Sequence, residues 1–156
     1  MADSGGMASV NMRRSQVILR LPVEHVTASL TLDDGDRFEA VLFVSPDENM
    51  PRFLTAPERF LPAMREGKVL LIARTAIASL GVPSKVVDND LPIETQAAIV
   101  RLRSGEVLEG ELRWTAPVGQ RRTIDYLNSD DPYLEVHAEG RTHYVMKSHV
   151  ATVEER

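Results

Sequence analysis

Three histidines of the C-terminal half stand at spacings that could bring their rings together. His137 and His143 flank Glu139-Gly140, a dipeptide typical of a hairpin turn, and His149 follows on the next segment. Imidazole nitrogens are common zinc ligands, so these rings could form a metal site. The N-terminal half has no histidine at the corresponding positions, and no carboxylate pattern completes the set. We therefore expect solvent-exposed strand residues, with no metal and no cofactor.

A set of arginines near two aromatic residues is the candidate surface for a nucleic acid. Arginine pairs with phosphate, and Trp114 and Tyr126 could stack on unpaired bases. The alternative is pairing with the neighbouring Glu106, Glu109 and Glu111, which contributes only a few tenths of a kcal/mol per pair. We favour that alternative. The arginines in question are Arg101, Arg103, Arg113, Arg121 and Arg122.

The carboxylates Asp125, Asp130 and Asp131 are the candidates for acid–base chemistry. General acid–base catalysis needs a carboxylate that is buried or otherwise perturbed, and the segment 128–132, with the sequence NSDDP, is typical of an exposed turn. Phosphate-binding loops, dinucleotide fingerprints and nucleophile elbows are absent from the sequence. We expect no catalytic residues and a protein that is not an enzyme.

Composition and charge narrow the classes further. The 156 residues are 43% hydrophobic and 26% charged, which is typical of a globular protein. The net charge is −5, divided as −1 over residues 1–80 and −4 over residues 81–156, so neither half is basic and RNA binding is disfavoured. Cysteines are absent, no apolar run reaches the roughly 20 residues of a membrane helix, and the N-terminus does not resemble a signal peptide. We expect a cytoplasmic protein that does not enter a membrane.

The strongest pattern is an internal repeat. Residues 21–42 match residues 91–112 at a constant offset of 70, and residues 53–80 match residues 126–153 at an offset of 73. The matches fall on alternating apolar positions and on turn glycines, which are the positions that a backbone dictates. Identical pairs include Leu32/Leu102, Gly35/Gly105, Glu39/Glu109, Leu42/Leu112, Leu61/Leu134 and Gly67/Gly140.

The repeat predicts the same strands in each half. Hairpins are expected around Gly35 and Gly105, with Leu30 opposite Phe38, and second hairpins around residues 66–67 and 139–140. A short last strand is expected at 76–80 and at 149–154. Five antiparallel strands in so few residues predict a small closed barrel, because closure removes exposed edges. The predicted organisation is all-β: a mobile tail at 1–16, a first five-stranded barrel at 17–80, a linker at 81–90 and a second barrel at 91–156.

The second half resembles the Sm-like superfamily, which includes the bacterial RNA chaperone Hfq and is related in shape to SH3-like barrels. The segment 100–112, VRLRSGEVLEGEL, has the turn glycine and the second glycine five residues later that the family's first motif shows. The segment 146–153, MKSHVATV, resembles the second motif of Hfq, although Ser148 separates Lys147 from His149. The chain is also similar to uncharacterised bacterial proteins built on such domains. The resemblance implies ring assembly through edge strands and makes Lys147 a fifth candidate RNA contact, besides Arg101, Arg103, Arg121 and Arg122.

Three functions follow as expectations. The first is a non-catalytic interaction or scaffolding module that self-associates through barrel edges, with a further protein partner possible. The second is an Sm-like RNA-binding protein. The third is a small-ligand sensor with its site between the two halves.

Overall fold

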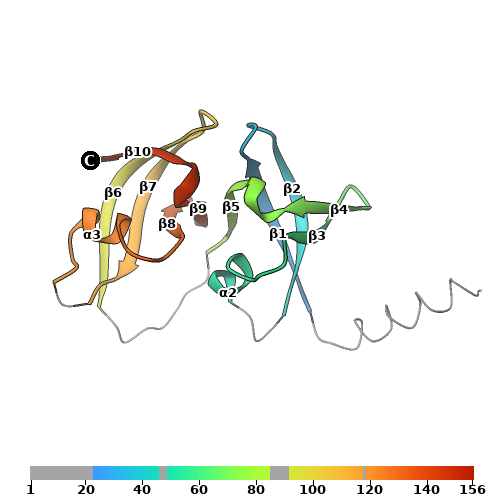
Figure 1. The fold of residues 1–156 in the computed structure, drawn as a ribbon, viewed down its shortest axis with the longest axis horizontal. Coiled ribbons are helices and arrows are strands. Elements are labelled where there is room, and N and C mark those ends of the chain that lie inside the picture. Colours follow the sequence, from blue (N-terminus) through green and yellow to red (C-terminus); the bar gives the residue numbers. More distant parts are fainter. Residues whose placement is uncertain (1–22, 46–48, 85–91, 118) are drawn as a thin grey trace, which may run out of the picture.

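The computed structural model describes residues 23–45, 49–84, 92–117 and 119–156, and its regular structure is dominated by β-strands (Figure 1). The prediction of an all-β chain is confirmed. The predicted N-terminal tail at 1–16 lies outside the described residues, as does most of the predicted linker.

The described residues of the first half form five strands and two short helical segments. In chain order these are β1 (Glu24–Leu32), β2 (Arg37–Val44), α2 (Met50–Leu54), β3 (Phe60–Arg65), β4 (Lys68–Ala73), the 3-10 turn η1 (Arg74–Ala76) and β5 (Ile77–Pro83).

The second half contains the same kinds of element in the same order. These are β6 (Ile93–Leu102), β7 (Val107–Thr115), α3 (Thr123–Leu127), β8 (Tyr133–Ala138), β9 (Arg141–Met146), the 3-10 turn η2 (Lys147–His149) and β10 (Val150–Glu155).

All ten strands belong to one antiparallel sheet rather than to two closed barrels. The strand order is β10-β6-β7-β8-β9-β5-β1-β2-β3-β4. Closure of the first half would pair β4 with β5, but β5 pairs instead with β9 of the second half. The prediction of barrel closure is therefore wrong in this respect: the edge of β5 is covered by the other half of the chain, not by its own.

The hairpins form as the glycines predict. Leu30 pairs with Phe38 in the first hairpin, and Val100 pairs with Leu108 in its counterpart. Gly35 and Gly105 have φ angles of 90° and 95°. The second hairpins turn through Glu66-Gly67 and Glu139-Gly140, in which all four residues have positive φ. Two consecutive positive φ angles are the signature of the two-residue type I′ turn, whose twist matches that of the strands.

Two elements differ from the expectation. The sequence pattern predicted only strands and turns, whereas the segments around α2 and α3 each form one helical turn. Asn49 caps α2, whose first turn contains Pro51, and in α3 the carboxylate of Asp125 accepts a hydrogen bond from the backbone N–H of Arg122 at 3.2 Å. β5 also continues to Pro83, so residues 81–83 belong to a strand and not to the linker.

The apolar side chains form two clusters, one in each half, and each cluster takes in a residue of the other half. Ala78 of β5 lies in the second cluster, while Tyr144 of β9 packs against the first. Leu42 and Leu112, which correspond to each other in the repeat, are both completely buried. The two cores are therefore joined through β5 and β9.

Among the glycines that the structure describes, Gly110 on β7 is the one at which backbone of the neighbouring strand leaves no room for a Cβ atom. A Cβ atom there would lie 2.6 Å from the carbonyl oxygen of His137 on β8. We expect Gly110→Ala to lower the free energy of unfolding by about 1–2 kcal/mol, because the β7·β8 pair must shift to admit the methyl group. Urea unfolding measures this, with Ala40→Gly at the corresponding position of β2 as the matched change in the opposite direction. Loss of no more stability than in the control would contradict the prediction.

Candidate functional site

The joint between the halves is a strand pair. β5 and β9 pair over five residues, from Ser79 opposite Val145 to Pro83 opposite Arg141. The residues from Ile77 to Val82 are all buried: β1 and β9 pair with the two edges of the strand, and its apolar side chains pack into the two core clusters. A surface strand of the first half thus becomes an interior strand of the whole sheet.

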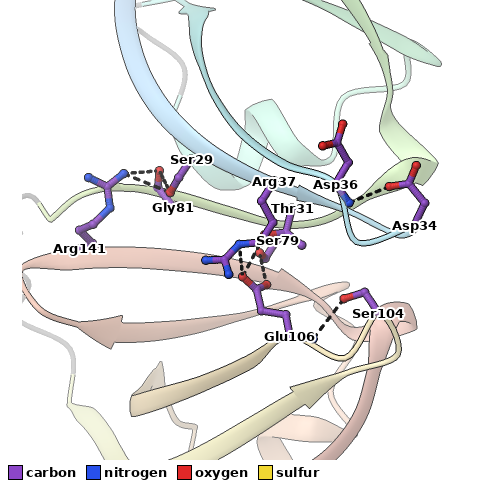
Figure 2. Close-up of polar contacts among 10 residues, drawn as sticks. All are labelled: Ser29, Thr31, Asp34, Asp36, Arg37, Ser79, Gly81, Ser104, Glu106 and Arg141. Atoms are coloured by element: carbon purple, nitrogen blue, oxygen red, sulfur yellow. Dashed lines mark hydrogen bonds and ion pairs between the residues drawn. The ribbon is translucent and has the colours of Figure 1, made fainter.

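One carboxylate anchors the joint beside the strands. Glu106, in the turn between β6 and β7 of the second half, reaches across to the first half (Figure 2). Its carboxylate accepts hydrogen bonds from the hydroxyls of Thr31 and Ser79 at 3.0 and 3.1 Å, and Arg37 Nε lies 3.4 Å away. The Glu106 side chain is only 8% exposed, while the Arg37 side chain is 71% exposed. The two buried hydroxyls are therefore the main partners of Glu106.

A second polar contact closes the other end of the joint. Arg141 of β9 donates a hydrogen bond of 2.9 Å to the carbonyl of Gly81 and one of 3.3 Å to the hydroxyl of Ser29 (Figure 2). Gly81 lies directly opposite His143, and a Cβ atom on Gly81 would come within 2.7 Å of that ring. Burial, together with the nearby Arg141 charge, lowers the pKa of His143. The neutral ring is thus the form that this joint accommodates.

The two outermost strands of the described sheet have edges like those that β5 and β9 pair with each other, but no further strand pairs with them. β4 ends the sheet on one side and β10 on the other (Figure 1). On β4, Val69 is 67% exposed and Leu71 is 65% exposed. Exposed aliphatic side chains on an edge strand favour the addition of another strand.

The candidate RNA-binding arginines are not gathered on one patch. Arg101 and Arg103 lie near the turn that joins β6 to β7, and Arg121 and Arg122 lie in the loop at the other end of this hairpin. Nine residues of strand, roughly 30 Å, separate the two pairs. Arg122 forms an ion pair with Asp125 at 3.1 Å, and this interaction raises the pKa of Arg122 and lowers that of Asp125.

The arginines were expected to pair with Glu106, Glu109 and Glu111, and the ion pairs in the structure differ in part from that expectation. Arg113 pairs with Glu111 at 2.9 Å on the same strand, and Arg156 pairs with Glu109 at 2.7 Å. Neither Arg101 nor Arg103 has a side-chain hydrogen bond or ion pair with the described residues. RNA binding by these arginines stays a prediction.

Lys147 is used within the fold. Its ammonium donates hydrogen bonds to the carbonyls of Tyr126 and Ser129 and to the hydroxyl of Ser129, at 2.9–3.1 Å. These carbonyls lie at and just beyond the end of α3, and the Tyr126 carbonyl also accepts hydrogen bonds from the N–H and the hydroxyl of Ser129. An ammonium has three protons, and all three are engaged. Its counterpart Arg74 donates in the same way to the carbonyl of Phe53 in α2.

The histidines and the acidic turn do not converge. His137 contacts Glu135 at 3.3 Å and Thr142 at 3.4 Å, and His149 lies 3.1 Å from the carbonyl of Thr75 in the first half. Asp130 and Asp131 are exposed. Within the described ranges, no group of three or more histidine, aspartate or glutamate side chains is arranged to hold a metal ion.

A groove of about 790 Å³ runs between the halves, beside the two 3-10 turns. Phe60 and Ile77 line it from the first half, and Met146 and His149 from the second. A groove at this place agrees with the third expectation, a ligand site between the halves, which remains a prediction.

Fold and joint together define an all-β chain whose two similar halves share one sheet. No protein-family model, no curated protein and no solved structure matches the chain. Among the helices that the structure describes, none has the length and apolar character needed to cross a membrane.

Proposed function

We propose that this protein is a non-catalytic, self-associating module that joins further copies of itself through its two outermost strands. The observation that carries the proposal is the β5·β9 pair, in which an edge strand of one half accepts the edge strand of the other. The counterpart of β5 is β10 and the counterpart of β9 is β4, and these two strands end the described sheet. The same kind of joint can therefore be repeated between chains.

Each half is also proposed to be an Sm-like or SH3-like unit. The order of strands in the first half is β5-β1-β2-β3-β4, and the second half repeats it as β10-β6-β7-β8-β9. Units of this size bury too little surface to be very stable alone, and sharing a sheet supplies further burial.

The experiment compares the mass of the protein in solution with that of one chain, 17.4 kDa. Sedimentation at increasing concentration should give masses above this value. Leu71→Lys should weaken the association about tenfold or more, since a lysine on an edge strand opposes pairing with another strand. Ile93→Lys, which places the same charge at an exposed aliphatic position away from β4, is the matched control and should leave the mass unchanged.

A second variant tests the strand edge itself. In a two-residue hairpin the pair that closes the turn, here Arg65 with Lys68, is hydrogen-bonded. Hydrogen-bonded and non-hydrogen-bonded pairs alternate along antiparallel strands, so the pair of Leu71 with Pro62 is non-hydrogen-bonded. The N–H of Leu71 therefore points away from β3, and Leu71→Pro removes it without breaking the β3·β4 pair. A wild-type protein that stays at the mass of one chain at all concentrations would overturn the proposed function.

A further inference from the structure

We infer that the chains join head to tail, with β4 of one chain against β10 of the next, and that two ion pairs between the chains select this arrangement. The pairs are Asp36 with Arg101 and Lys68 with Glu154. This inference rests on the proposed function and adds the polarity, the register and the specificity of the contact.

The residue correspondence between the halves supplies the geometry. Every residue of the joint has a counterpart 70 positions away on the first hairpin, or 73 positions away on the later strands. The counterparts also occupy the same places in their hairpins, as the equal registers show. The contacts across β5·β9 can therefore be translated, residue by residue, to a contact between β10 and β4.

The first ion pair is the translated Glu106 anchor. The counterpart of Glu106 is Asp36, which has the same charge, and the counterpart of Thr31 is Arg101. In the joint between chains the hydroxyl of Thr31 is thus replaced by the guanidinium of Arg101. The hydroxyl of Ser79 is replaced by that of Thr152. Asp36 and Arg101 are both exposed in the single chain.

The second ion pair is the translated Arg141 contact. The counterpart of Arg141 is Lys68, which has the same charge, and the counterpart of Gly81 is Glu154. In the joint within the chain the guanidinium of Arg141 donates to the Gly81 carbonyl. In the joint between chains Glu154 takes the place of Gly81 and Leu70 takes that of His143, so the Leu70 side chain must turn aside from the direction of the His143 ring for the Glu154 carboxylate to approach Lys68. The counterpart residues of both contacts thus carry opposite charges.

The proposed register brings two positive charges close together, and one of them already has an ion-pair partner in its own chain. Translation places Arg156 opposite Lys68, since Arg141 pairs with Pro83. Arg156 is held by Glu109 of its own half at 2.7 Å.

Apolar burial supports the same register. Val69 and Leu71 on β4 correspond to Thr142 and Tyr144 on β9. Thr142, which pairs with Val82 in the β5·β9 joint, is 5% exposed, whereas Val69 is 67% exposed and Leu71 is 65% exposed. A strand added to β4 in this register covers both side chains. Head-to-tail contacts of this type use two different surfaces, so they can continue from chain to chain or close into a ring.

Charge reversal at the first pair tests the inference. Asp36→Arg and Arg101→Asp should each weaken self-association about tenfold or more in sedimentation measurements at low salt. An equimolar mixture of the two variants should recover association. Every contact between unlike variants then brings together opposite charges, either in the wild-type arrangement of Asp36 with Arg101 or with the two charges exchanged. The double variant D36R/R101D should recover it in a single chain. Glu39→Arg is the control for net charge, since its counterpart Glu109 makes no contact with the first half among the described residues.

The same design with Lys68→Glu and Glu154→Lys tests the second pair independently. Wild-type association that is indifferent to all four reversals, or single variants that the mixture and the double variant do not rescue, would overturn the inference while leaving self-association intact. A wild-type chain that does not associate would instead remove the proposed function. Circular dichroism of each variant separates loss of contact from loss of fold.

Discussion

Glu106→Ala should lower the free energy of unfolding by about 3 kcal/mol. The substitution leaves the hydroxyls of Thr31 and Ser79 without their carboxylate acceptor, and these residues are 5% and 4% exposed. A hydrogen bond to a charged group contributes about 1.5–3 kcal/mol, and a buried donor left without a partner adds the cost of its desolvation. Arg37 adds little, because its side chain remains in water.

Urea unfolding measures this loss, at a concentration where the wild-type protein is a single chain, since association would raise the apparent stability. Asp36→Ala is the matched control: it removes a carboxylate from the corresponding turn, where the side chain is exposed, and should cost less than about 0.5 kcal/mol. Glu106→Gln keeps an oxygen acceptor and should fall between the two. Equal losses for Glu106→Ala and Asp36→Ala would show that the carboxylate does not anchor the halves.

Lys147→Met should lower the free energy of unfolding by about 2–3 kcal/mol. Methionine fills a similar volume but cannot donate to the carbonyls of Tyr126 and Ser129. The Tyr126 carbonyl keeps its hydrogen bonds from Ser129, so the loss falls mainly on the Ser129 carbonyl. Burial lowers the pKa of Lys147, so the site already carries a desolvation cost that its acceptors must offset. The net effect is therefore smaller than the sum of three charged hydrogen bonds.

This substitution separates a structural role from a role in RNA binding. Arg121→Met, at an exposed position of the neighbouring loop, is the control and should change stability by less than about 0.5 kcal/mol. Urea unfolding and binding of an oligoribonucleotide at low salt are measured on the same samples. If Lys147→Met retains full stability but binds less RNA than the wild-type protein, the structural assignment is wrong.

The strands and turns followed from local rules. Alternation placed Leu30 and Val100 on buried faces, and the turn glycines set the registers that the structure shares with the prediction. These features depend on residues close together in the chain, where period-two patterning and positive φ angles have few alternatives.

Those local rules did not predict that the two halves stay open as barrels or that β5 pairs with β9. Whether β5 pairs with β4 or with β9 depends on segments about sixty residues apart, and the backbone pattern of an edge strand is the same in both cases. Glu106 was interpreted as a partner for nearby arginines because its hydroxyl partners lie on other elements. One signal was present: β5 is apolar on both faces from Ile77 to Val82, apart from Ser79 and Gly81, and that composition is typical of an interior strand.

The covalent chain makes one kind of joint permanent. β5·β9 forms whenever the chain folds, whereas β4·β10 must be formed by collision, so protein concentration controls only every second joint in an assembly of the proposed kind. Growth then proceeds by two half-sheets at a time. Any ring that closes contains an even number of half-sheets, however many chains take part.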